Sequence, residues 1–189
     1  MRRSIRSILV LLIVVFAVIF VVHHRHPAAN PAPIPVPPPP APVVQQTPQT
    51  PLNAHIYNET ADAKEDIVGA MALAQATNKN VLLDFGANWC PDCQVLDIYM
   101  HDPINSALIT KYYIPVHIDV GQMNKNLDVA YTFNVPINKG IPALAVVQPS
   151  GRVVYSQAHG EFNNMRAMQS SALTEFLKMW KPAQPNTEK

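Results

Sequence analysis

The chain has 189 residues, with 14 Lys and Arg against 13 Asp and Glu. Every basic residue before position 52 is an arginine with no acid near it, so residues 52–189 carry ten basic and thirteen acidic residues, a net charge of −3. This balance excludes the clustered basic surface of a nucleic-acid binder, so we expect no nucleic-acid partner. The same span is long enough to fold as one domain with a core of its own, without disulfide staples or metal.

Residues 8–22 form an unbroken apolar run between MRRSIRS and HHRH. The run reaches the lower limit for a membrane span only if Ser7 and His23 are counted, since about 17–25 residues are usual. We predict that residues 1–26 form an uncleaved membrane anchor; a cleaved signal peptide is the alternative, and Ala28 and Ala29 would allow it. The preceding arginines should stay cytoplasmic. Both alternatives place the remaining chain across the membrane, either in the periplasm on a single-pass inner-membrane anchor or as a secreted or periplasmic protein.

Residues 27–51 are so rich in proline that they cannot build a helix or a sheet, and they favour extended polyproline II. At about 3.1 Å per residue, such a linker could reach on the order of 75 Å. We interpret it as a passive spacer between the anchor and a folded domain over 52–189. A docking ligand for a proline-binding module is the alternative.

The folded part begins with a predicted helix and a predicted strand. Residues 60–78 have acids in the first turns and an apolar stripe that we expect to be buried, made of Ile67, Val68, Met71, Leu73 and Ala74. Residues 81–86, VLLDFG, read as a buried strand. Two cysteines follow the strand directly and residues 94–100 look helical, so both cysteines lie at a strand-to-helix junction.

The later elements continue this alternation. Asp102 is the predicted N-cap of a helix whose first residue is Pro103. We then predict a strand over 114–120, a helix over 126–133, a hairpin of strands 143–148 and 152–157, and a closing helix over 163–181. The closing helix should bury Met165, Met168, Leu173, Phe176, Leu177 and Trp180. Helices between strands and a late hairpin indicate an α/β domain with a mixed central sheet that helices flank on both faces.

The only two cysteines, Cys90 and Cys93, lie in the stretch NWCPDC. This spacing suits electron transfer, half of a metal site or a small structural disulfide. A structural zinc needs four ligands, and the histidines are scattered without ligand spacing, so we expect no metal. A disulfide closing so small a loop would stabilise little. Redox exchange is the favoured use, with no cofactor beyond the reversible disulfide Cys90–Cys93.

The stretch VLLDFGANWCPDC, with GIPAL about fifty residues later, resembles the thioredoxin superfamily over residues 60–181. The resemblance implies a thioredoxin-like fold and thiol–disulfide exchange with protein thiols and disulfides. It also implies that Asp84 is the buried Asp of the strand before the motif, and that Pro142 follows a cis peptide bond.

The resemblance and the helix start give the site residues distinct roles. The helix N-terminus favours a thiolate at Cys90, which is normally exposed in this fold and should attack the substrate. Cys93, one turn inward, should resolve the mixed disulfide while Asp84 takes its proton. The remaining predicted site residues contribute to packing and to the substrate groove: Trp89, Pro91, Asp92, Ile141 and Pro142.

Several positions depart from the thioredoxin pattern. The dipeptide between the cysteines is Pro91-Asp92, and an acid there should disfavour a thiolate at Cys90, which favours a reductase. The lysine that faces the buried Asp in thioredoxin has no match, but His117 lies nearby in sequence. We expect His117 to be a strand residue with a local hydrogen bond; a proton relay is the alternative. A reductase also needs a membrane electron donor. The alternatives are an oxidase or isomerase, and a non-catalytic thioredoxin-like binding or chaperone module. We expect a monomer.

Overall fold

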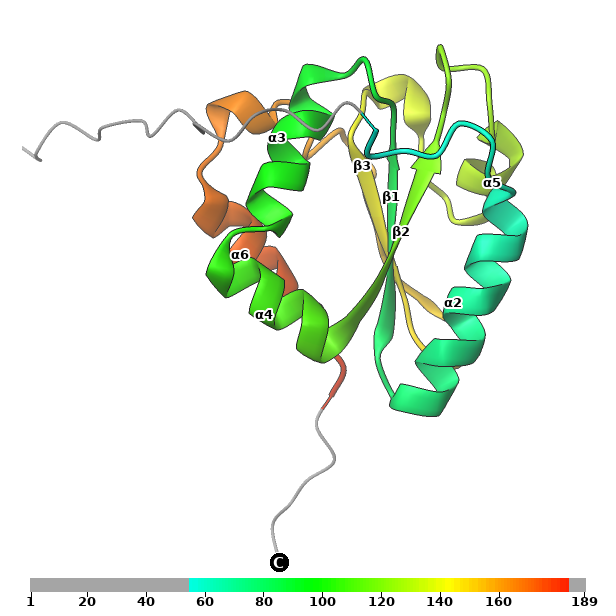
Figure 1. Ribbon diagram of the computed structural model, residues 1–189, viewed down its shortest axis with the longest axis vertical. Coiled ribbons are helices and arrows are strands. Elements are labelled where there is room, and N and C mark those ends of the chain that lie inside the picture. Colours follow the sequence, from blue (N-terminus) through cyan, green and yellow to red (C-terminus); the bar gives the residue numbers. More distant parts are fainter. Residues whose placement is uncertain (1–54, 184–189) are drawn as a thin grey trace, which may run out of the picture. The chain divides into compact units, whose positions relative to one another are not determined.

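The structure of the chain is a computed structural model that describes residues 55–183 (Figure 1). The predicted anchor over 1–26 and the predicted linker over 27–51 lie outside the described residues. Within residues 55–183, no helix combines the length and the apolar character that a membrane crossing requires.

The centre of the fold is a four-stranded sheet with the order β2-β1-β3-β4. Strands β1 (Asn80–Gly86) and β2 (Tyr113–Asp119) run parallel. Strand β3 (Ala143–Val147) is antiparallel to β1 and to β4 (Val153–Ser156), so the sheet is mixed, as predicted. Strand β1 is buried along its whole length because it lies between two strands and under helices on both faces.

Helices cover both faces of this sheet (Figure 1). On one face, α2 (Ala63–Thr77) and the short α5 (Leu127–Thr132) bury Ile67, Ala74 and Val129 against the sheet. On the other face, three helices surround Leu82 and Leu144: α3 (Pro91–Met100), α4 (Pro103–Tyr112) and α6 (Ser170–Met179). Two 3₁₀ turns complete the order, η1 (Ile137–Lys139) and η2 (Met165–Ala167). The predicted three-layer α/β architecture is therefore confirmed.

Side chains at the helix starts explain where the helices begin. The Asp62 carboxylate caps α2 by accepting from the backbone N–H of Lys64 at 2.9 Å. The predicted N-cap at Asp102 is confirmed, because its carboxylate accepts from the Ile104 N–H at 3.1 Å. Helix α3 begins at Pro91, three residues before the predicted start, with Cys90 as its N-cap.

The apolar stripe predicted for the first helix is partly wrong. Val68 is 69% exposed and Leu73 is 52% exposed. The residues of α2 that face the sheet are instead small ones with Ile67, namely Ala63, Ala70 and Ala74. Alanines let α2 lie close to β1 and β2. The face of the helix that contacts the sheet is therefore the one with the smallest apolar side chains.

The closing helix predicted over 163–181 is also wrong in extent. The chain forms η2, turns extended at Met168 and starts α6 only at Ser170. The break follows from a long-range contact, because the backbone N–H of Arg166 donates to the Asp92 carboxylate at 2.9 Å and fixes the segment beside the start of α3. Met165, Leu173 and Leu177 are nevertheless buried, as expected.

Candidate active site

Both cysteines are free thiols at the start of α3. Cys90 Sγ accepts from the Cys93 backbone N–H at 3.2 Å and lies 3.6 Å from the Ile141 carbonyl oxygen. Cys90 is only 4% exposed, which corrects the expectation of an exposed nucleophile; the segment at Ile141 packs over it in the same apolar cluster. Cys93 is fully buried beneath it.

The two thiols differ in acidity. The pKa of Cys90 is lowered, first by a hydrogen bond from Cys93 and then by the backbone N–H groups of Cys93 and Asp92. Burial and, weakly, the Asp92 charge act in the opposite direction. Burial, followed by the Cys90 contact and the negative charge of Asp84, raises the pKa of Cys93 far above its usual value. The pair thus has one thiol prepared to attack and one that keeps its proton until a base removes it.

Asp84 lies on β1 directly opposite His117 on the parallel neighbour β2. Its carboxylate is almost completely buried, and Oδ2 lies 2.9 Å from both the Tyr57 hydroxyl and His117 Nδ1. Oδ1 has no hydrogen-bond partner among the described residues. A buried carboxylate is stable only when its charge is compensated, so Tyr57 and His117 hold Asp84 while one oxygen keeps a free lone pair.

Tyr57 is a site residue that the sequence reasoning missed. Its hydroxyl donates to Asp84 across 27 residues of chain separation. Gly86 makes room for it: a Cβ on Gly86 would overlap the Tyr57 hydroxyl and lie 2.9 Å from Cys93 Sγ. The hydroxyl and the buried thiol therefore share the small space above Gly86. No periodicity or motif marks Tyr57, since it precedes the first helix in an irregular segment.

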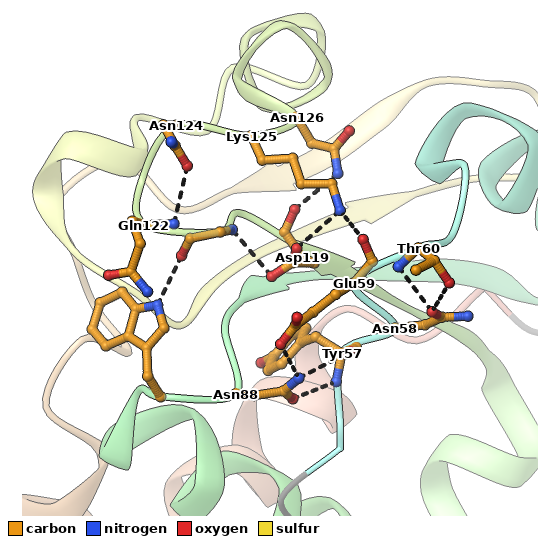
Figure 2. A network of polar contacts seen from close by, with 12 residues as sticks. Tyr57, Asn58, Glu59, Thr60, Asn88, Asp119, Gln122, Asn124, Lys125 and Asn126 are labelled. Carbon is orange, nitrogen blue, oxygen red and sulfur yellow. Dashed lines mark hydrogen bonds and ion pairs between the residues drawn. The ribbon is translucent and has the colours of Figure 1, made fainter.

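A network of polar contacts holds Tyr57 over the end of the sheet (Figure 2). The Tyr57 N–H donates to Asn88 Oδ1 at 2.9 Å, and Asn88 Nδ2 donates to the Tyr57 carbonyl at 2.9 Å. Lys125 contacts the Glu59 carbonyl oxygen and pairs with Asp119 at 3.1 Å. Residues 57–59 are thus fixed to the loop that precedes α3 and to the end of β2.

Asp92, which lies between the cysteines, forms an ion pair with Arg166. Arg166 Nη2 lies 3.2 Å from Asp92 Oδ2, and Arg166 Nε lies 3.2 Å from Oδ1. The same Oδ1 accepts from the Arg166 backbone N–H, as described above. Asp92 is only 7% exposed, so this two-pronged ion pair compensates a nearly buried charge. The arginine reduces the repulsion that Asp92 exerts on a Cys90 thiolate.

The remaining predicted site residues surround Cys90. Trp89 is 50% exposed, and its Nε1 donates to the Gly121 carbonyl at 2.8 Å. Pro91 is the exposed first residue of α3. The Ile141–Pro142 peptide bond is cis, as the resemblance implied, and places the Ile141 carbonyl against Cys90 Sγ. All eight predicted residues therefore gather at one end of the sheet.

Metal ligands form no cluster in the part of the chain that the structure describes: residues 55–183 contain no group of three or more His, Cys, Asp or Glu placed to hold an ion. The two thiols face a buried carboxylate, a tyrosine and a peptide carbonyl. The chemistry that this donor set supports is proton transfer and thiol–disulfide exchange.

One family model and several solved structures are similar to this chain. The family model described as "Thioredoxin-like" matches residues 62–149. A crystal structure titled as a disulphide isomerase from Xylella fastidiosa Temecula1 is 40% identical, with a TM-score of 0.64, covering 66% of this chain and 95% of that one. The oxidised C-terminal domain of DsbD from Neisseria meningitidis is 17% identical, with a TM-score of 0.48, covering 64% and 97%.

A thioredoxin from Thermus thermophilus is 22% identical, with a TM-score of 0.45, covering 59% of this chain and 81% of that one. No curated protein matches the chain significantly.

Proposed function

The chain belongs to the thioredoxin-like family, and on that premise we propose that it is a membrane-tethered oxidoreductase that reduces protein disulfides through Cys90 and Cys93. The observation that carries the proposal is the contrast between the two thiols, one with a lowered pKa at a helix start and one buried against Asp84. The protein disulfide is the substrate, and the cysteine pair is the only redox group required.

The proposed reaction has two exchanges. The Cys90 thiolate attacks one sulfur of the substrate disulfide, so that a mixed disulfide forms and the other substrate sulfur leaves as a thiolate. Cys93 then loses its proton to Asp84 and attacks Cys90 Sγ, which releases the second substrate thiolate. Two electrons pass to the substrate, both substrate thiolates take up protons, and Cys90–Cys93 is left as a disulfide. A separate membrane electron donor must reduce that disulfide before the next turnover.

Two acidic groups favour the reductase direction. Asp84 raises the pKa of Cys93, and Asp92, although paired with Arg166, opposes the lowering of the Cys90 pKa; both effects destabilise thiolates relative to the disulfide. Strong oxidants of this chemistry owe their behaviour to a strongly stabilised reduced form. We expect the equilibrium of Cys90–Cys93 with glutathione to give a potential near thioredoxin's, about −270 mV. A value near about −120 mV would contradict the reductase proposal.

The Asp92–Arg166 pair provides a test of this charge argument. Arg166→Ala exposes the nearly buried Asp92 charge to Cys90, so the pair should become more reducing; Asp92→Ala removes the charge and should make it more oxidising. A tenfold change in the equilibrium constant corresponds to about 30 mV for this couple. Both variants are measured by glutathione equilibration, with Lys178→Ala as a control that breaks a surface pair to Glu175 far from the site. Shifts in the same direction would contradict the argument.

An isomerase is the second candidate, and the observation that favours it is the 40% identical relative titled a disulphide isomerase. An isomerase rearranges disulfides in its substrate, so the substrate's own thiol can release Cys90 without Cys93. Reduction needs Cys93 in every turnover. Recovery of activity by a scrambled ribonuclease, compared between the wild-type protein and Cys93→Ala, separates the two: retained recovery in the variant favours the isomerase, and its loss favours the reductase.

The membrane tether is part of the proposal and rests on the apolar run over residues 8–22. We expect the full chain to stay with the membrane fraction after an alkaline carbonate wash, with the cysteine-bearing domain accessible to protease from the periplasmic side. A chain that begins at residue 52 should appear in the soluble fraction. Release of the full chain by the wash would favour the cleaved signal peptide instead. The tethered protein is proposed to act as a monomer.

A further inference from the structure

The buried thiol of Cys93 has to exchange its proton with solvent in every cycle, yet Cys93 and Asp84 are both almost completely enclosed. We infer that Tyr57 and His117 complete a proton path, in which the Tyr57 hydroxyl passes the Cys93 proton to Asp84 and His117 connects Asp84 with solvent. This inference rests on the proposed function and adds two residues to it. The proposed function already makes Asp84 the proton acceptor of Cys93. It does not say how the proton reaches Asp84 or how it then leaves for solvent.

The first half of the path lies above Gly86. The Tyr57 hydroxyl donates to Asp84 Oδ2 at 2.9 Å, so its oxygen lone pairs remain free to accept a proton. The Cys93 sulfur faces the same space, which the missing side chain of Gly86 leaves open. A concerted shift would move the thiol proton to the Tyr57 oxygen while the Tyr57 proton moves to the carboxylate. Neither a tyrosinate nor a tyrosine cation forms in this shift.

The acidity of Tyr57 suits a shuttle. Burial raises the pKa of Tyr57 well above its usual value, and the negative charges of Asp84 and Cys93 raise it further. The hydroxyl therefore keeps its proton at neutral pH and transfers one only when it receives another. Asp84 is the proton acceptor of the pair, because its Oδ2 already accepts the hydrogen bond of the Tyr57 hydroxyl and its Oδ1 has no partner among the described residues.

The second half of the path leads through His117. Its Nδ1 lies 2.9 Å from Asp84 Oδ2, while the side chain as a whole is 28% exposed. His117 also lines a pocket of about 410 Å³ between α2 and the edge strand β2, together with Asp66 and Asn58. Among these residues, only the imidazole both contacts the buried carboxylate and has surface of its own. In the tautomer with its proton on Nε2, the ring accepts the proton of a protonated Asp84 at Nδ1 and releases one from Nε2, which leaves Nδ1–H donating to the ionised carboxylate.

The charged groups around this path determine its pH dependence. Burial alone would lower the pKa of His117, but the hydrogen bond and charge of Asp84, with the charge of Asp97, raise it above its usual value. Asp97, on α3, has a pKa raised by burial, although the nearby His101 and His117 oppose the rise. A cationic His117 carries a proton on both ring nitrogens and cannot accept another from Asp84. The rate of the Cys93 step should therefore increase as the pH rises through the pKa of His117, above about 6.5.

A two-phase reaction separates this path from the rest of the mechanism. The reduced protein, mixed with the aromatic disulfide dithiobis(nitrobenzoate), releases one nitrothiolate when Cys90 attacks and a second when Cys93 resolves. Stopped-flow absorbance follows both phases. Tyr57→Phe should slow the second phase about tenfold to a hundredfold and leave the first within twofold. Tyr113→Phe, which also loses a buried hydroxyl hydrogen bond, at 2.7 Å to the Leu177 carbonyl, should leave both phases unchanged.

The histidine has its own variant and control. His117→Asn keeps an N–H donor for Asp84 but cannot titrate, so the pH inflection of the second phase should disappear. His101→Asn is the matched control, an exposed histidine with Nδ1 at 2.8 Å from the Asp97 carbonyl oxygen, and should retain the inflection. A second phase unaffected by Tyr57→Phe, or an inflection retained in His117→Asn, would overturn the inference.

A further measurement needs no variant and can contradict the path even if Tyr57→Phe does not fold. Proton transfer in the resolving step should make the wild-type second phase slower in deuterium oxide than in water, which is a solvent deuterium isotope effect above 1. An effect near 1 would overturn the path. The first phase is judged separately: if it is absent, Cys90 is not a nucleophile and the proposed function itself fails.

Discussion

Replacing Cys93 with alanine will convert the protein into a trap for its substrates. Cys90 keeps its place at the start of α3 and still attacks, but no second thiol releases the mixed disulfide. Reductase turnover should fall by a factor on the order of 10³ or more, because the two cysteines act as a unit. Non-reducing electrophoresis of the membrane fraction should show new covalent adducts that disappear with added thiol reductant.

The control for this result is Cys90→Ala, which should form no adducts and show no turnover. Cys93 is fully buried, so its replacement leaves a small cavity, and a loss of about 1 kcal/mol of unfolding free energy is expected without loss of the fold. Thermal unfolding of both variants checks that inactivity is chemical. Adducts formed by Cys90→Ala and absent from Cys93→Ala would reverse the assigned roles. Adducts absent from both would favour the non-catalytic binding module.

Among substitutions that add a single methyl group, Gly86→Ala is expected to disturb the site most. The new Cβ would overlap the Tyr57 hydroxyl and lie 2.9 Å from Cys93 Sγ, closer than real Cβ atoms approach. Tyr57 is fixed at its backbone by Asn88 and Cys93 by α3, so neither can move cheaply. Overpacking of this kind typically costs about 1–3 kcal/mol. The displaced hydroxyl should also slow the resolving step.

Gly69→Ala is the matched control for that change. Gly69 lies in α2, and a Cβ there meets nothing within 4 Å. Alanine is the better helix former by about 0.8–1 kcal/mol, so this variant should unfold at a higher denaturant concentration than the wild-type protein while Gly86→Ala unfolds at a lower one. Equal stability of Gly86→Ala and wild type would show that Tyr57 does not occupy the space above Gly86.

Local patterns were sufficient to predict the order of the strands and helices and the cysteine junction, but not the extent of the closing helix. The apolar run VLLDFG and the turn residues Pro149-Ser150-Gly151 can each be recognised within a few residues of sequence. Strand β1 and the β3–β4 hairpin form at these positions. Asp84, Cys90 and Cys93 lie within ten residues of one another on one strand and the helix after it. Their proximity follows from local geometry alone.

The partners of those residues could not be predicted because they come from distant segments. Tyr57 reaches Asp84 over 27 residues, His117 over 33, and Arg166 reaches Asp92 over 74. Such contacts depend on which strands pair and how loops return to the sheet, which periodicity does not encode. The effect assigned to Asp92 was incomplete for the same reason, since its charge was considered without the arginine beside it.

The contacts of Asn88 and Lys125 with residues 57–59 matter when the chain is shortened from its N-terminal side. The family match begins at residue 62, which is the N-cap of α2 and follows the last of these contacts. A chain that begins at residue 62 would keep all four strands and both cysteines, but it would lack the tyrosine that contacts Asp84. The first residue of a shortened chain therefore decides whether Tyr57 takes part in the resolving step.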